Sequence, residues 1–142
     1  MSDYILDTNI PSELTRNRPE PRVADWLELA GDSELFLSAI TIGELHKGFV
    51  LQPDSKRRLF LENWFQTELL PWFEGRILPV TMEIAERWRR LDGSCRLKGT
   101  TLNTADGLIA ATALEYGFTV VTRNVKDFAR LGVPIFNPWE QA

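Results

Sequence analysis

Three short apolar segments of this chain each contain one acidic residue where a hydrophobic residue would be expected. These residues are Asp7, Glu44 and Asp106. A buried carboxylate without a partner is costly, and several that converge repel one another unless a cation joins them. The first hypothesis is therefore that a divalent metal ion binds these carboxylates, and the chemistry this suggests is hydrolysis of a phosphate ester.

Asp7 directly follows Tyr4–Leu6, a segment typical of a short buried strand. In open α/β sheets ligands bind beyond the carboxyl ends of the strands, so this position favours a functional role. The alternative is that Asp7 only caps the next helix. Pro11 suits the first turn of that helix, and Asn9 is a second candidate for its cap.

Glu44 lies three residues after Thr41, which is the spacing of a capping box. In that interpretation the carboxylate only binds the backbone of its own helix, predicted over Thr41–Leu51. In the functional interpretation Gly48, one turn later on the same face, leaves room beside the carboxylate. The sequence leaves both interpretations open.

Asp106 lies in the first turn of a helix predicted from Asn103 to Gly117. The apolar positions 109, 110, 113 and 114 form the inward stripe of this helix, and Asp106 extends that stripe toward the helix start. The helix dipole stabilises a carboxylate there by about 0.3–1 kcal/mol, which is less than the several kcal/mol that its burial costs. A metal ion or a cationic partner is therefore the better explanation for Asp106.

Two more polar residues, Asn124 and Asp127, follow a strongly β-branched strand predicted over Phe118–Thr122. The alternatives are that Asn124 is a turn residue and that Asp127 only flanks a short helix over Val125–Leu131. In a parallel sheet the carboxyl ends of the strands meet at one edge. We therefore keep both residues as candidates for the same site.

Strand-like and helix-like segments alternate along the chain. The strand-like segments are apolar throughout, which is typical of a parallel sheet covered on both faces. We therefore expect one domain over residues 1–142 with an α/β fold of three layers, α/β/α, and a short, mostly parallel sheet. Besides the elements named above, strands are predicted over Leu35–Ser38, Ile77–Val80 and Pro134–Phe136, and helices over Val23–Leu29, Ser55–Leu70 and Thr81–Leu97.

The composition is that of a globular protein, with 44% hydrophobic and 25% charged residues and a net charge of −4 over 142 residues. No apolar run is long enough to cross a bilayer and no charged-then-apolar leader precedes Asp3, which predicts a cytoplasmic protein without membrane contact. The single cysteine, Cys95, excludes an internal disulfide, and with the single histidine, His46, it cannot make a zinc site. Any metal ion is therefore expected to have oxygen ligands.

Taken with their flanks, the acidic segments resemble a PIN domain, and most of all a VapC-type toxin of a bacterial toxin–antitoxin pair. Several such motifs in order, over nearly the whole chain, carry more weight than any one of them. The last motif is similar to the FitB branch of that group. The matching segments are Ile5–Ile10, Leu37–Leu45 with Gly48, Thr104–Ala113, Val121–Asn124 and Val133–Trp139.

The resemblance implies an endoribonuclease that depends on Mg²⁺, with Mn²⁺ as the alternative. By position, Asp7, Glu44 and Asp106 match the acidic metal-site residues of the family. The fourth acidic position is Asn124 here, so either an amide or a water replaces the carboxylate, or Asp127 supplies the charge from one helical turn on. We expect Asp7 and Asp106 to bind the metal ion. Glu44 would bind a metal-bound water or act as the base, and Asn124 or Asp127 would orient the reactants.

The resemblance also implies partners: an RNA substrate, a second copy of the chain in a homodimer, and a cognate antitoxin, with which such toxins form hetero-oligomers. Ser38 and Thr8 are candidates for supporting the acidic residues. The basic cluster Arg87–Lys98 is the first candidate for following the RNA backbone. The simpler interpretation of this cluster, and of Lys56–Arg58, is a solvated helix face.

Two other functions remain open. Phosphotransfer enzymes and receiver domains also place an aspartate after the first strand of a parallel sheet. The phosphatases of this kind require a second aspartate where the chain has Asn9, and receivers require a late lysine where the chain has Arg123. The second alternative is a PIN-like scaffold that binds RNA or protein without cleaving it, for which Asn124 is the sequence argument.

Overall fold

In the computed structural model, which describes residues 3–140, five strands form one parallel sheet. Their order across the sheet is β3-β2-β1-β4-β5, and every pairing is parallel. Because β1 is the central strand, the residue that follows it lies in the middle of the edge where the strands end. The strands are β1 (Tyr4–Leu6), β2 (Leu35–Ser38), β3 (Ile77–Leu78), β4 (Thr119–Val121) and β5 (Ile135–Phe136).

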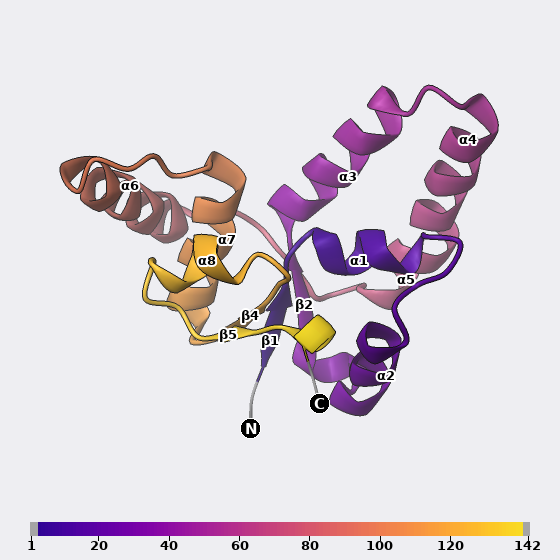
Figure 1. Ribbon diagram of the computed structural model, residues 1–142, viewed down its shortest axis with the longest axis horizontal. Helices are drawn as coiled ribbons and strands as arrows, with labels where there is room; N and C mark the ends of the chain where they lie inside the picture. Colours follow the sequence, from indigo (N-terminus) through magenta and orange to yellow (C-terminus); the bar gives the residue numbers. More distant parts are fainter. Residues whose placement is uncertain (1–2, 141–142) are drawn as a thin grey trace.

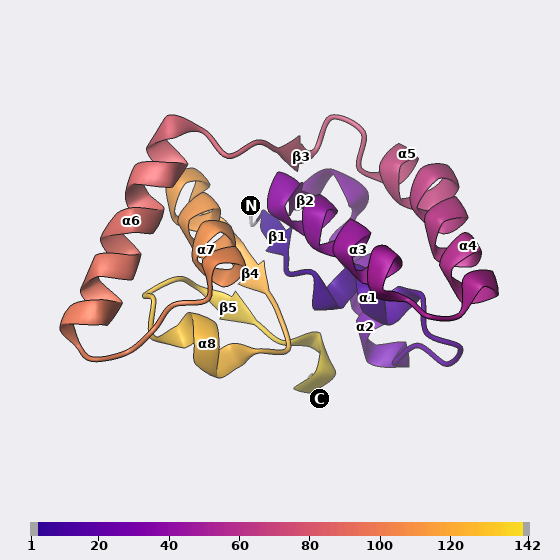
Figure 2. The same ribbon diagram turned by 90° about the horizontal axis from the view of Figure 1, so that it is seen from above.

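Helices cover both faces of this sheet, so the expected three-layer α/β/α fold is confirmed (Figures 1 and 2). Helices α6, α7 and α8 lie on one face, and α1, α2, α4 and α5 lie on the other. Helix α3 continues from the end of β2 and contacts both α4 and α7. The helices are α1 (Asn9–Leu14), α2 (Pro21–Ala30), α3 (Ala39–Leu51), α4 (Ser55–Trp64), α5 (Leu70–Trp72), α6 (Met82–Leu97), α7 (Thr104–Tyr116) and α8 (Val125–Ala129).

Successive residues of the central strands enter different cores. Ile5 and Val120 pack in the core beneath α7, whereas Leu6 and Val121 pack in the core on the opposite face. All four are at most 1% exposed. A strand buried on both faces needs apolar residues at every position, which explains why these strands show no polar alternation.

Helix α3 begins two residues earlier than predicted. The Ser38 hydroxyl accepts a hydrogen bond from the backbone N–H of Ile40, so Ser38 is the N-cap and the helix starts at Ala39. Thr41 is therefore inside the helix and buried, and the capping box suggested for Thr41 and Glu44 is not formed. The side chain of Glu44 is thereby released for a tertiary contact.

Other helix ends agree with the sequence, with one exception. Thr81 and Asn103 cap α6 and α7 through their side chains, and Gly117 ends α7 in the left-handed conformation, at φ 75°. The exception is α1, where Thr8 is at the N-cap position and Asn9 is the first helical residue. Asn9 therefore does not cap this helix, and its amide is available to the residues at the strand ends.

Helix α7 is buried more completely than the expected single stripe. Every residue of the range 107–113 is buried because α6 and α3 pack against the side that faces away from the sheet. Gly107 lies at the closest approach of α6, where an added Cβ would be 2.8 Å from Trp88 Cδ1 and 2.8 Å from Leu102 Cδ2. The start of α7 is thereby fixed against its neighbours.

The stretch expected over Ser55–Leu70 is helical throughout, with a π-helical turn, η2 (Phe65–Leu69), between α4 and α5. Other predicted elements are shorter in the structure. Helix α8 ends at Ala129 instead of Leu131. β3 ends before Pro79, which lacks the N–H that a sheet ladder requires. No helix within residues 3–140 combines the length and the apolar character needed to span a bilayer. The prediction of one domain over residues 1–142 extends beyond the described residues at both ends and stays a prediction.

Candidate active site

The candidate site is centred on Asp7, which lies directly beyond the end of β1. Its side chain is only 4% exposed. The backbone N–H of Thr8 donates to Oδ1 over 2.8 Å, and the Thr122 hydroxyl donates to Oδ2 over 2.8 Å. Burial raises the pKa of Asp7, these two hydrogen bonds oppose that shift, and the charges of Glu44 and Asp127 add to it. The carboxyl group of Asp7 is thus buried and is repelled by neighbouring negative charges.

Sequence reasoning missed Thr122 as a residue of this site. Leu6 pairs with Val121 across the β1–β4 ladder, so the residues that follow, Asp7 and Thr122, are neighbours at the strand ends. Strand pairing is the signal that would have identified it, because Thr122 is the first residue beyond the last β4 pair. The hydroxyl of Thr122 also accepts from the backbone N–H of Asn124, over 2.9 Å.

Glu44 reaches this site from the first half of α3. The Thr8 hydroxyl donates to Glu44 Oε1 over 2.5 Å and lies 3.2 Å from the Thr41 hydroxyl. Thr8 directly follows Asp7 in the chain, so the pair Asp7–Thr8 connects the end of β1 to α3. The structure therefore brings Glu44 to Asp7, and it does so through Thr8, which the sequence identified only as a candidate for support.

Asp106 enters from the first turn of α7 and is half-buried. Its pKa is raised from 3.8 to about 6, first by burial and then by the negative charges of Asp7, Asp127 and Glu44, while Arg130 opposes the shift. The structure therefore places four carboxyl groups within electrostatic reach of one another. They come from four segments that are far apart in the sequence.

Asn124 and Asp127 differ in their relation to these acids. Asp127, in the first turn of α8, raises the pKa values of both Asp7 and Asp106. Asn124 is exposed, and among the hydrogen bonds of residues 3–140 only its backbone N–H contacts the site, through Thr122. Asp127 is exposed as well, and as the acid of the two it adds negative charge to the site, which a neutral amide cannot do. The choice between the two residues for the fourth acidic position stays a prediction.

The sequence suggested Asn9 as a helix cap, but its side chain contacts Asp7 instead. Its Nδ2 donates to Asp7 Oδ2 over 3.2 Å and lies 3.4 Å from the Thr122 hydroxyl. Its Oδ1 is buried and has no hydrogen-bond partner among the described residues. An unpaired buried oxygen next to a carboxylate is unfavourable unless a donor or a cation completes it.

Glu13 shows what a structural buried carboxylate looks like in the same protein. It is 5% exposed, receives an ion pair from Arg16 at 3.1 Å and accepts the backbone N–H of Glu20 at 2.9 Å. By contrast, no ion pair within residues 3–140 involves any of the acids gathered at the strand ends. These acids are Asp7, Glu44, Asp106 and Asp127. No cationic side chain within residues 3–140 forms an ion pair that would offset the repulsion among them.

These donors suit a hard divalent cation. No three His, Cys, Asp or Glu side chains within residues 3–140 are already arranged as a metal cluster. Mg²⁺ nevertheless needs only one or two carboxylates because it keeps several waters. The mutual repulsion of the acids and the unpaired oxygen of Asn9 are both relieved by a cation with oxygen ligands. His46 packs on Phe65 with ring centroids 4.5 Å apart, so the histidine is not part of this site.

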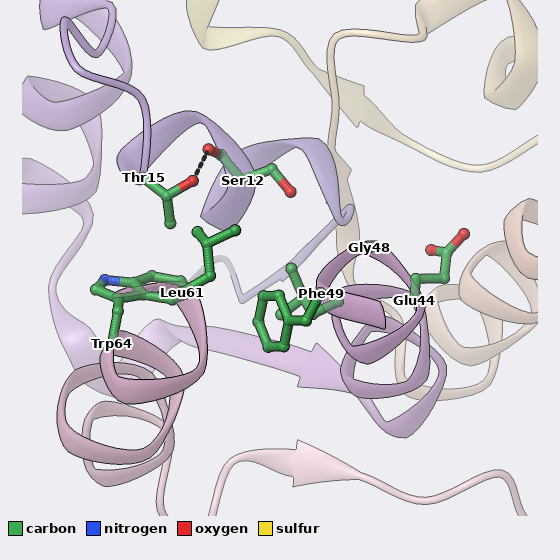
Figure 3. Close-up of a pocket in the computed structure, with 8 residues that line it drawn as sticks. Ser12, Thr15, Glu44, Gly48, Phe49, Leu61 and Trp64 are labelled. Carbon is green, nitrogen blue, oxygen red and sulfur yellow. Dashed lines mark hydrogen bonds between the residues drawn. The ribbon is translucent and has the colours of Figure 1, made fainter. Parts of the chain in front are cut away.

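An apolar pocket of about 140 Å³ adjoins Glu44 between α1, α3 and α4. Figure 3 shows Phe49, Leu61 and Trp64 on one side of this pocket, with the carboxylate of Glu44 directed away from them. Ser12 and Thr15 line the α1 side. Glu44 and this pocket therefore share helix α3, so a molecule seated in the pocket would lie beside Glu44.

The basic cluster Arg87–Lys98 is partly paired with acids. Arg87 pairs with Glu115 at 3.0 Å, and Asp92 receives two arginines from its own helix, each at 3.2 Å. Exposed pairs of this kind contribute about 0–1 kcal/mol each. Arg90 and Lys98 are exposed and make no ion pair within residues 3–140, so the cluster keeps positive charge, and both interpretations of it stay predictions.

Comparison with known proteins identifies the family of the chain. The PIN domain model matches residues 4–134. The VapC ribonuclease Y4jK of Sinorhizobium fredii is 39% identical over 97% of this chain and 99% of its own length. Toxin FitB of Neisseria gonorrhoeae is 38% identical over 95% of this chain and 97% of its own length.

The crystal structure of FitAcB from Neisseria gonorrhoeae superimposes with a TM-score of 0.90 and 37% identity, over 97% of this chain and 99% of that one. The family and the fold thus agree with the resemblance read from the sequence. The chain belongs to the PIN-domain family.

Proposed function

We propose that this protein is an endoribonuclease and the toxin of a toxin–antitoxin pair, and that it cleaves RNA phosphodiesters with the help of a divalent metal ion. The observation that carries the proposal is the convergence of carboxyl groups from distant segments without an ion pair among the described residues. The pKa of Asp106 is raised to about 6, first by burial and then by the negative charges of the other three acids. The names of the relatives, a ribonuclease and a toxin, agree with it.

Asp7 and Asp106 are the residues that would hold the metal ion, with Asp127 as a further acid and Asn9 Oδ1 as a neutral oxygen beside Asp7. When bound, Mg²⁺ or Mn²⁺ would supply Lewis-acid stabilisation of the charge that develops on the phosphate oxygens. Thr8 donates to Oδ1 of Asp7, and both Thr122 and Asn9 donate to Oδ2, so the carboxylate is fixed and Oδ1 keeps a free lone pair. The protein thus orients the ligand before the cation arrives.

Glu44 is the candidate general base. Thr8 occupies Oε1 and fixes the side chain, which leaves Oε2 to accept the proton of the attacking water. As the new P–O bond forms and the old one breaks, the leaving oxygen takes up a proton from solvent. In this assignment Thr8 is a positioning residue, because it acts on the reaction only through Glu44.

The decisive experiment measures cleavage of RNA by antitoxin-free protein with and without Mg²⁺. We expect Asp7→Asn to abolish Mg²⁺-dependent cleavage, because it removes a metal ligand while the amide keeps the size of the side chain. The matched control is Asp25→Asn, an exposed carboxylate on α2, which should cleave like the wild type. Cleavage that persists in Asp7→Asn would remove Asp7 from the mechanism. RNA binding without any cleavage by the wild type would favour the non-catalytic scaffold.

The antitoxin is the proposed protein partner, and the pocket beside Glu44 is the surface we assign to it. Its apolar walls, Phe49, Leu61 and Trp64, suit a hydrophobic side chain of a bound helix or arm. A segment seated there would also lie beside Glu44. Co-purification of a small second chain, and its loss when Leu61 is changed to Asp, would test this assignment.

A further inference from the structure

One cavity of the protein opens from the segment that joins β4 to α8. It has a volume of about 530 Å³ and is lined by Arg123, Asn124, Val125, Lys126, Asp127 and Glu140. Two of these residues, Asn124 and Asp127, were candidates for the catalytic site. Two others, Arg123 and Lys126, are cations that make no ion pair within residues 3–140.

The cavity is directly connected to the acids. The backbone N–H of Asn124 donates to the Thr122 hydroxyl, which in turn donates to Asp7 Oδ2. Asp127 lines the cavity and also acts electrostatically on Asp7 and Asp106. A chain molecule that places one group at the acids would therefore place its neighbouring group in this cavity.

Arg123 is held in place by the C-terminal segment of the described structure. Its guanidinium carbon lies 5.3 Å from the ring centroid of Trp139. Trp139 is 7% exposed and packs in the core with α2, and its backbone N–H donates to Asn137 Oδ1 over 2.9 Å. The motif Asn137–Trp139, which the proposed reaction does not use, thus acquires a role. It gives an exposed arginine a fixed partner beside the site.

RNA is the polyanion that the proposed function brings to this surface, and the protein has a net charge of −4. Binding RNA therefore requires cations at defined positions rather than a general positive field. The arginine fork matches phosphate oxygens, and a fixed arginine loses less conformational freedom on binding than a mobile one. Because Asp127 and Glu140 also line the cavity, a free anion gains little there. A phosphate tethered to a neighbour at the acids is better placed.

We propose that this cavity is a phosphate subsite, in which Arg123, held by Trp139 and assisted by Lys126, binds the RNA phosphate next to the one that is cleaved. This inference rests on the proposed function, because it assigns a further part of the same substrate. It makes Arg123 a binding residue and Trp139 its positioning residue.

The test is binding of a short fluorescein-labelled single-stranded RNA, followed by anisotropy over a series of salt concentrations. All proteins carry Asp106→Asn, so that the RNA stays intact. Arg123→Ala should weaken binding about ten-fold, the lower end of the effect of a hydrogen bond to a charged group. It should also reduce the slope of log K against log salt by about 0.7, the value for one phosphate contact on a single strand.

The matched control is Arg18→Ala, an exposed arginine between α1 and α2 that lies outside both basic clusters and lines no cavity described above. This change also removes one positive charge. It should change the RNA affinity by less than about two-fold, because the removed charge does not lie in the cavity. Arg123→Lys should keep the salt slope and lose part of the affinity, since a lysine keeps the charge without the fork. Trp139→Phe should give a smaller loss than Arg123→Ala at an unchanged slope.

Equal RNA affinities of the Arg123→Ala and Arg18→Ala proteins would overturn the inference. So would an Arg123→Ala protein that binds RNA normally and instead loses a co-purifying protein partner, because the cavity would then be a protein interface. If Arg123→Ala unfolds at a lower temperature, Arg123→Lys decides the question through its retained slope. Wild-type protein that fails to cleave RNA, with the Arg123 effect present, would defeat the proposed function and leave the subsite standing.

Discussion

The buried acids of this protein differ in what surrounds them. Glu13 is satisfied by Arg16 and a backbone N–H, so its burial needs no further explanation. Asp7 and Asp106 instead face other carboxyl groups, and the pKa of each is raised. Burial is the largest cause of both shifts, and the like charges add to it. At this scale the environment of a carboxylate, and not its burial alone, separates a structural acid from a candidate metal ligand.

Asp106 makes a prediction about stability and pH. Its pKa is about 6 in the folded protein and 3.8 when unperturbed. Between these values the folded state binds more protons than the unfolded state, so this carboxyl group lowers the stability as the pH rises through that window. We expect Asp106→Asn to stabilise the metal-free protein at pH 7.5 by on the order of 1 kcal/mol, after screening of a half-exposed group.

The measurement is thermal unfolding in EDTA at pH 7.5 and again near pH 4, where the carboxyl group is largely protonated in the folded protein. The stabilisation should be present at the higher pH and absent at the lower one. Asp25→Asn is the control and should change neither. A melting temperature of Asp106→Asn that stays at or below that of the wild type at pH 7.5 would show that Asp106 is not under repulsion.

Thr8 makes a prediction about catalysis. Thr8→Val keeps the shape of the side chain and removes the hydroxyl that donates to Glu44. We expect kcat to fall about ten-fold, the loss typical of removing a hydrogen-bond partner from a functional carboxylate, with KM for RNA little changed. Steady-state kinetics checks this. A raised KM at an unchanged kcat would mean that Thr8 contacts RNA rather than positioning Glu44.

The secondary-structure elements position the acids through their ends. β1 and β4 end side by side, which brings Asp7 next to Thr122, while α3 presents Glu44 from its first half and α7 presents Asp106 from its first turn. Parallel strands require helical crossovers, and those crossovers return successive elements to the same edge of the sheet. The site is thus a consequence of the topology, and each element contributes a single acid to it.

Local signals explain which parts of this arrangement could be predicted from the sequence. Thr81, Asn103 and Gly117 act on their own helix ends, and they were identified correctly because such caps depend on neighbouring residues alone. The contact between Thr8 and Glu44 spans 36 positions, so no local pattern predicts it. The fold class followed from the alternation of apolar strands and helices, whereas the choice between Asn124 and Asp127 stays a prediction.

Gly107 makes a prediction at the level of helix packing. A Cβ there would lie 2.8 Å from side-chain atoms of Trp88 and Leu102, so Gly107→Ala should destabilise the fold by about 1–3 kcal/mol. Gly43→Ala is the matched control, because Gly43 is an exposed helical glycine with nothing within 4 Å of the added Cβ. That change should be neutral or stabilise by up to about 1 kcal/mol. Urea unfolding of both variants measures the difference, and equal stabilities would contradict the close packing of α6 on α7.

At the level of the whole molecule, a negatively charged protein is proposed to bind negatively charged RNA. The protein has a net charge of −4, and its acids gather where the RNA is proposed to bind. A divalent cation resolves this conflict at the centre of the site, and cations such as Arg123 act at its rim. On α6 three arginines pair with two acids, Glu115 and Asp92, and Arg90 makes no ion pair within residues 3–140, so this helix also keeps positive charge. Function at this scale thus depends on where the charges lie rather than on their sum.

The most direct test of the account is calorimetric titration of antitoxin-free protein with Mn²⁺ at pH 7.5, for the wild type, Asp7→Asn, Asp106→Asn and Asp25→Asn. We expect saturable Mn²⁺ binding by the wild type and by Asp25→Asn. We also expect a loss of at least about ten-fold in affinity for the other two, since even outer hydrogen-bond partners of metal ligands have effects of that size. Equal Mn²⁺ affinities in all four proteins, or no binding by the wild type, would contradict a metal site built by Asp7 and Asp106.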